Sequence, residues 1–182
     1  MIIDASAIVA ILKGEPGAER VTRLIAADPA PKMSAATVVE LYAVADHRGE
    51  PAQARRVDAL LTTLNIALVP FDDAQAQLAR QAYRDFGRGS GHPARLNLGD
   101  CFTYALAAHT LEPLLFSGDD FSHTDLATVA CDGATAASLE ALARAGLATR
   151  PVADLPLPDG PLPVPSGRTV DDLLNDIDEL SS

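Results

Sequence analysis

Residues 1–12 of the chain, MIIDASAIVAIL, place an acid between two apolar segments. Met1-Ile2-Ile3 is typical of a short buried strand, and Ala7–Leu12 has the composition of an apolar helix, with Ser6 as its expected N-cap. Asp4 therefore lies where a strand passes almost directly into a helix. A buried strand that ends on a carboxylate indicates either a capping residue or a functional acid at the edge of a sheet.

Residues 1–131 alternate short β-like segments with longer segments of helical period. Such alternation predicts an α/β fold in which a parallel sheet of about five strands is flanked by helices. Functional sites in these sheets lie at the carboxyl ends of the strands, near the point where the strand order reverses. We expect strands at Met1–Asp4, Lys32–Ser34, Ala67–Phe71, Leu114–Ser117 and Ala127–Ala130, and helices at Ala18–Ala27, Val38–Arg48, Ala52–Asn65, Asp73–Phe86 and Leu98–Leu111.

Composition limits the class of protein. With 182 residues, 48% of them hydrophobic, the chain can bury a core of ordinary size. Its net charge of −11 argues against a nucleic-acid-binding surface over the whole molecule but permits a local basic patch. The two cysteines lack metal-ligand spacing, and we expect Cys101 to pack as a small apolar residue. We find no signal peptide and no long apolar segment, so we expect a cytoplasmic protein without membrane contact.

The chain changes character after residue 131. Six of the 13 prolines lie between Pro151 and Pro165, a density suited to extended polyproline geometry. A short helix is expected before this segment and an amphipathic helix after it, capped by Thr169. Residues 1–131 hold 11 Lys+Arg against 16 Asp+Glu, whereas residues 132–182 hold 3 against 9. We therefore expect a domain at 1–131 followed by an acidic extension at 132–182.

Several acids are expected at one edge of the sheet. They are Asp4, Glu40, Asp100 and the adjacent pair Asp119 and Asp120. Each acid taken singly could cap a helix or occupy a turn. Several carboxylates brought together without Lys or Arg repel one another, however, and would bind protons or a cation. An all-oxygen set without His or Cys suits Mg²⁺ or Mn²⁺ better than zinc.

Four motifs, in order and spacing, resemble the PIN-domain ribonucleases, and among them the VapC-type toxins of bacterial toxin–antitoxin pairs. They are MIIDASAIVAIL, SAATVVEL, LNLGDCFTYALA and LLFSGDDFSHTDLATV, and together they span residues 1 to about 130. The resemblance implies Mg²⁺-dependent endonucleolytic cleavage of RNA, with Asp4, Glu40 and Asp100 as metal-binding acids. Asp120 is our choice for the fourth acid and Asp119 is the alternative.

Two serines are candidates for supporting the acids. Ser6 and Ser117 could supply hydroxyls that orient a carboxylate or a metal-bound water. A helix cap and a strand-end residue are equally good accounts of them.

A basic strip precedes the Asp100 helix. Residues 80–95 contain four arginines, Arg80, Arg84, Arg88 and Arg95, with three glycines and two aromatic residues. Arginine beside exposed aromatic rings suits single-stranded RNA, because it binds phosphates while the rings stack on bases. The alternative is a solvated arginine face, with Tyr83 and Phe86 packed into the core.

The extension at 132–182 resembles, less specifically, the toxin-wrapping half of a cognate antitoxin. The resemblance implies a tail that docks on its own domain or on a neighbouring copy, with Leu173, Leu174 and Ile177 as apolar anchors. Arg168 or Arg150 could pair with the acid cluster in place of the metal. The alternative is a disordered acidic extension. The family usually dimerises, so we also expect a homodimer.

Other functions fit the acid-ended strand less well. A haloacid-dehalogenase-type phosphatase needs a second Asp at position 6, where this chain has Ser6. A phosphoacceptor signalling domain needs a late lysine, and the only lysines are Lys13 and Lys32. A catalytically silent RNA-binding or regulatory protein of the PIN fold remains the main alternative.

Overall fold

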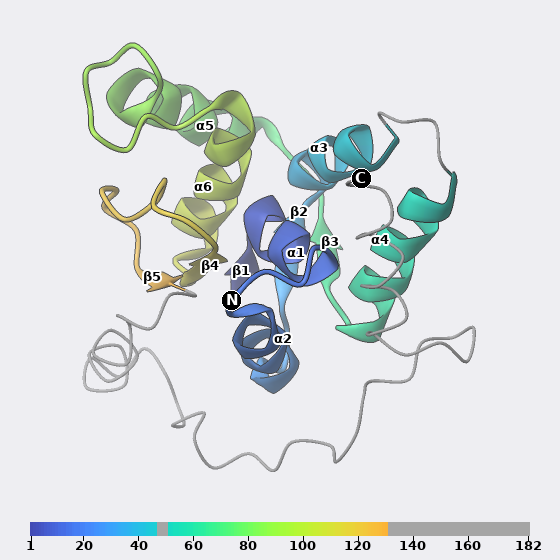
Figure 1. The fold of residues 1–182 in the computed structure, drawn as a ribbon. Helices are drawn as coiled ribbons and strands as arrows, with labels where there is room; N and C mark the ends of the chain where they lie inside the picture. Colours follow the sequence, from blue (N-terminus) through green and yellow to red (C-terminus); the bar gives the residue numbers. More distant parts are fainter. Residues whose placement is uncertain (47–50, 131–182) are drawn as a thin grey trace.

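A computed structural model describes residues 1–46 and 51–130 of the chain (Figure 1). Up to β4, each strand is followed by helices before the next strand begins, as the sequence predicts, and β5 follows β4 without a helix. The strands are β1 (Ile2–Ile3), β2 (Lys32–Ser34), β3 (Ala67–Val69), β4 (Leu114–Phe116) and β5 (Thr128–Ala130). The helices are α1 (Ala5–Leu12), α2 (Ala18–Ala27), α3 (Ala35–Asp46), α4 (Pro51–Thr63), α5 (Asp73–Phe86) and α6 (Leu98–Thr110).

The five strands form one parallel sheet in the order β3-β2-β1-β4-β5. Ile2 in the central strand is in register with Lys32 of β2 on one side and Leu114 of β4 on the other. The chain extends the sheet from β1 to β3 in one direction and then returns to add β4 and β5 on the opposite side. The strand order therefore reverses between β1 and β4, which is where a ligand site is expected in such a sheet. The predicted fold class is confirmed.

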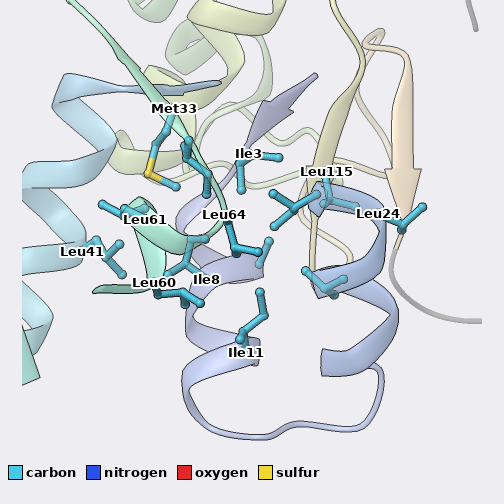
Figure 2. Packing of buried hydrophobic residues seen from close by; sticks show 14 of the residues in the cluster. Ile3, Ile8, Ile11, Leu24, Met33, Leu41, Leu60, Leu61, Leu64 and Leu115 are labelled. Carbon is cyan, nitrogen blue, oxygen red and sulfur yellow. The ribbon is translucent and has the colours of Figure 1, made fainter. Parts of the chain in front are cut away.

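Helices cover both faces of the sheet because its strands alternate their side chains between two apolar clusters. Ile3 and Leu115 lie in a cluster with residues of α1, α2, α3 and α4, which Figure 2 shows around Ile8 and Ile11. Ile2 and Leu114 point into a second cluster with residues of α5 and α6. Burying an aliphatic side chain of this size stabilises the fold by about 1.5–3 kcal/mol. The two clusters fix the helices that carry the acids relative to the strands.

Most expected element boundaries agree with the structure to within a few residues, and two differences concern the site. Asp4, not Ser6, is the N-cap of α1, because Asp4 is the single residue between the strand and the helix. Helix α3 begins at Ala35 rather than Val38, since β2 ends at Ser34. Both strand ends thus pass directly into helices whose first turns lie at the edge of the sheet.

Cys101 is fully buried in the cluster beneath α6, as expected for a cysteine that packs as a small apolar residue. No helix in residues 1–46 and 51–130 has the length and apolarity needed to cross a bilayer. The expected tail elements, including Thr169, lie outside the described residues.

Candidate active site at the carboxyl ends of the strands

The Asp4 side chain is held at the end of the central strand by hydrogen bonds from Ser6 of α1, which is itself bonded to the residue after β4. The Asp4 side chain is buried, and its Oδ2 accepts hydrogen bonds from the backbone N–H of Ser6 at 2.9 Å and from the Ser6 hydroxyl at 2.6 Å. The Ser6 hydroxyl oxygen in turn accepts from the backbone N–H of Ser117 at 3.1 Å. Ser6 therefore ties the Asp4 carboxylate to the end of β4, while Ser117 takes part through its backbone.

Asp100 occupies the third position of α6 in a capping box. Its backbone N–H donates to Oδ1 of Asn97 at 2.9 Å, and its Oδ2 accepts from the backbone N–H of Asn97 at 2.6 Å. This reciprocal pair satisfies two helix-end donors and orients the Asp100 carboxylate. The sequence analysis did not identify Asn97 as a capping residue, although an Asn three residues before an acid at the start of a helix is a recognisable capping pattern.

Glu40 comes from α3 and lies against the first turn of α6. A Cβ placed on Gly99 would be 1.8 Å from Oε2 and 2.3 Å from Cδ of Glu40, so the carboxylate occupies the space that a side chain at position 99 would fill. The two helices are joined nearby by a buried hydrogen bond of 2.9 Å between the hydroxyls of Thr37 and Thr103. Sequence reasoning found Glu40 but missed these three supporting residues.

The pKa of Asp100 shows that the acids lie close enough to repel one another. Burial raises this pKa from its ordinary value of 3.8 to about 6, the charges of Asp4, Asp120 and Glu40 act in the same direction, and the bond from Asn97 opposes them. The pKa of Glu40 is also raised. Burial is the larger cause and the charge of Asp4 is the smaller one. No Lys or Arg of the described residues is among the causes of either shift. Within residues 1–46 and 51–130 the site is a carboxylate cluster, and no Lys or Arg of these residues lowers the pKa of Asp100 or Glu40.

The adjacent acids after β4 differ in their relation to the cluster. Asp119 and Asp120 are both exposed, in the segment that follows Phe116. Asp120 contributes to the raised pKa of Asp100, whereas Asp119 does not. This difference favours Asp120 as the fourth acid.

The PIN domain family matches residues 1–126. Ribonuclease VapC42 of Mycobacterium tuberculosis is 55% identical over 126 residues, which are 69% of this chain and 96% of the relative. This chain belongs to the VapC family of PIN-domain ribonucleases. Ribonucleases VapC28 and VapC30 of the same organism are 47% and 48% identical, over 68% and 71% of this chain and 93% and 98% of their own lengths. The resemblance seen in the four motifs is confirmed.

The donor set of this VapC-family chain fits a hard divalent cation, because it offers carboxylate oxygens in a partly buried, mutually repelling group. In residues 1–46 and 51–130, no three His, Cys, Asp or Glu side chains are arranged to hold one ion between them. The four predicted acids therefore do not form a three-ligand site in the part of the chain that the structure describes. Mg²⁺ keeps several waters and is usually held by one or two protein carboxylates. Asp4 and Asp100, the two acids fixed by hydrogen bonds, would hold the ion, and Glu40 and Asp120 would add negative charge.

The basic strip of this VapC-family chain lies on α5 and on the loop between α5 and α6. Its four arginines are exposed, and Arg84 pairs with Asp85 at 2.7 Å. The loop is closed by backbone bonds from Arg88 to Leu96 and from Leu96 to Phe86, both at 2.9 Å. It leads directly into the Asn97 cap, so Arg95 precedes Asp100 by only five residues. Arg80 and Arg84 thus lie on α5, and Arg88 and Arg95 lie on the loop.

The two aromatic residues of the strip have different environments. Phe86 is half-buried and packs against His92 and Tyr104, with ring centroids 4.9 and 5.5 Å apart. Tyr83 is 46% exposed, so the alternative in which both rings pack into the core is wrong for this residue. The predicted docking residues of the tail, Leu173, Leu174, Ile177, Arg168 and Arg150, lie outside the described residues.

Proposed function

We propose that residues 1–131 form a Mg²⁺-dependent endoribonuclease, the toxin of a toxin–antitoxin pair, which acts in the cytoplasm and is neutralised by its own antitoxin-like segment at 132–182. The ribonuclease class follows from membership of the VapC family. Mn²⁺ would serve in place of Mg²⁺, because it accepts the same oxygen ligands.

One observation carries the proposal: acids from four separate segments of the chain lie close enough together that the charges of Asp4, Asp120 and Glu40 all act on Asp100. These acids come from the residue after β1, from α3, from α6 and from the segment after β4, and the strand order reverses between β1 and β4. A fold gains no stability from assembling unneutralised carboxylates, so such a cluster indicates a functional site. When bound, Mg²⁺ supplies positive charge at a phosphate oxygen and lowers the pKa of a coordinated water.

The chain's own residues prepare the site. Ser6 holds one oxygen of Asp4 in place through two hydrogen bonds, and Asn97 does the same for Asp100 through its backbone N–H. The other oxygen of each carboxylate has no hydrogen-bond partner among the described residues and is therefore available to a cation. Because both acids are oriented before the cation arrives, little side-chain entropy is lost on binding.

The exposed arginines would bind the RNA backbone. The loop that carries Arg88 and Arg95 is joined to the Asp100 helix without an intervening element, so phosphates held by these arginines would approach the acids. Exposed Tyr83 would stack on a base. A local basic strip of this kind is compatible with the acidic charge of the whole chain.

The metal mechanism is tested by RNA cleavage with a chain that ends at residue 131, which contains both apolar clusters and the segment matched by the VapC relatives. We expect cleavage with Mg²⁺, none with chelator, and a loss of roughly 100-fold or more in Asp4→Asn and Asp100→Asn. The control is Asp73→Asn, an exposed acid on α5, which should cleave like the unmodified chain. Chelator-resistant cleavage, or cleavage that survives both site substitutions, would refute the mechanism.

The tail is tested by comparing this shortened chain with the full chain under the same conditions. Neutralisation predicts that the shortened chain cleaves RNA faster, because a covalently joined segment competes at a local concentration on the order of millimolar. Equal rates would show that the tail does not inhibit. The homodimer expected from the family stays a prediction, and a measurement of the mass of the chain in solution would test it.

The alternative, a catalytically silent RNA-binding protein, predicts a different pattern. Both lengths of chain would then bind RNA without cutting it, with Mg²⁺ or with chelator. The intact set of four acids favours the catalytic protein.

A further inference from the structure

Gly99 stands in the first turn of α6, immediately before Asp100, and its backbone does not require a glycine. Unlike Gly89 and Gly91, with φ of 96° and 83°, Gly99 has no left-handed backbone that would exclude a side chain. Glycine is a poor helix former, so this position carries a cost without a local conformational reason. The reason for a glycine at position 99 must therefore lie in the residues that pack around it.

The neighbour that a side chain at position 99 would meet is Glu40 of α3. A Cβ at position 99 would be 1.8, 2.3 and 2.5 Å from Oε2, Cδ and Oε1 of Glu40, and real Cβ atoms do not approach other atoms below 3.0 Å. The three nearest atoms all belong to that one carboxylate. The missing side chain of Gly99 is therefore a slot that holds the carboxylate of Glu40 against the start of α6.

Two features favour Glu40 in this slot. The N-terminal end of a helix carries partial positive charge, which offsets the repulsion from Asp4 and the burial that raise the pKa of Glu40. The buried hydroxyl pair Thr37–Thr103 joins α3 to α6, one helical turn from Glu40 on α3 and one turn from Asp100 on α6. Because this bond fixes the spacing of the helices, a larger residue at 99 would displace the flexible Glu40 side chain rather than separate the helices.

We propose that Gly99 is a positioning residue of the metal site. The space left by its missing side chain lets the Glu40 carboxylate lie beside the other acids, and a side chain at position 99 would displace that carboxylate. This inference rests on the proposed metal-dependent function. Gly99 itself touches neither metal nor substrate and acts only through Glu40.

The test is a double-mutant cycle of Gly99→Ala and Glu40→Gln in the full chain, with Mn²⁺ binding measured by calorimetry. We expect Gly99→Ala to weaken Mn²⁺ binding by roughly 10-fold or more, as Glu40→Gln does, and to add less than about twofold in the Glu40→Gln background. The control Leu98→Ala, an exposed neighbour in the same turn, should bind Mn²⁺ normally. Unchanged binding in Gly99→Ala, or an equal loss in both backgrounds, would overturn the inference.

A crystal structure of Gly99→Ala separates this inference from the proposed function. We expect α3 and α6 to stay in place and the Glu40 carboxylate to leave the slot; an unmoved Glu40 with a shifted α6 would overturn the proposal. If the unmodified chain bound no Mn²⁺, the proposed function would fail, while the crystal structure would still decide whether the slot holds Glu40. If Gly99→Ala failed to fold, Gly99→Ala with Glu40→Ala should fold, and failure of both would refute the slot.

Discussion

Replacement of Asp100 by Asn should make the metal-free protein more stable at neutral pH, although it removes an acid of the site. The pKa of Asp100 is about 6 in the folded protein and is ordinarily 3.8. Folding therefore favours the protonated acid. That contribution to stability is fully present below about pH 4 and is lost as the pH rises through about 6. Asparagine cannot ionise, and its side-chain oxygen can still accept the bond from the N–H of Asn97.

The size of the effect follows from the shift. A rise from 3.8 to about 6 corresponds to roughly 3 kcal/mol at about 1.4 kcal/mol for each pKa unit. Because Asp100 is only partly buried, solvent screening reduces this to about 1–2 kcal/mol. For a domain of this size the midpoint of thermal unfolding should rise by about 3–8 °C.

The assay is thermal unfolding in chelator at about pH 7.5 and about pH 4.5, followed by circular dichroism. Asp100→Asn should unfold at the higher temperature at neutral pH, and the gap should narrow at acid pH. With Mg²⁺ at about 100 times its dissociation constant, the unmodified chain should gain about 2.7 kcal/mol and the variant much less. A variant that is less stable than the unmodified chain in chelator at neutral pH would refute the carboxylate cluster.

Three further outcomes are expected. Ser6→Ala removes the hydroxyl bond to Asp4 and should cost about 1–2 kcal/mol of unfolding free energy and roughly tenfold in Mn²⁺ affinity, measured by denaturant titration and calorimetry. Glu112→Gln removes the ion pairs with Lys32 and with the N-terminal ammonium of Met1; because these bonds lower the pKa of Glu112 against the effect of burial, the loss of about 1 kcal/mol should be seen at pH 7 and should disappear as the pH falls below about 4. Arg95→Ala should weaken RNA binding and reduce its salt dependence by about one counterion, measured by fluorescence anisotropy.

Matched controls sharpen these tests. Ser122→Ala and Gln81→Ala change exposed residues and should leave stability and RNA binding unchanged. If Ser122→Ala cost as much stability as Ser6→Ala, the hydroxyl bridge would not be the cause. If Gln81→Ala and Arg95→Ala weakened RNA binding equally, the basic strip would not be the RNA path. A Glu112→Gln variant whose deficit grew at acid pH would contradict the direction of the pKa shift.

The order of elements could be read from the chain because it depends on local patterns. Helix α5, with Asp73 at its first position and Phe86 at its last, has the predicted bounds, and β2 agrees as well. Alternating strands and helices imply a parallel sheet, whose carboxyl ends share one edge, so the meeting of Asp4 and Asp100 was also predictable. The predicted starts of α1 and α3 were wrong because each helix follows its strand without a loop. The same residue types cap helices and end strands, so the sequence does not distinguish the two positions.

Residues 1–130 by themselves determined the fold class, and they predicted the edge of the sheet and the acids of the candidate site, because apolar periodicity and residue type are local properties of the chain. Only the tertiary structure decided which acids influence one another, so that Asp120 rather than Asp119 acts on Asp100. It alone showed that Glu40 lies over Gly99, 59 residues away in the chain. No local pattern specifies such a contact, because it exists only when the packing of α3 on α6 brings a carboxylate to the one position of that turn that has no side chain.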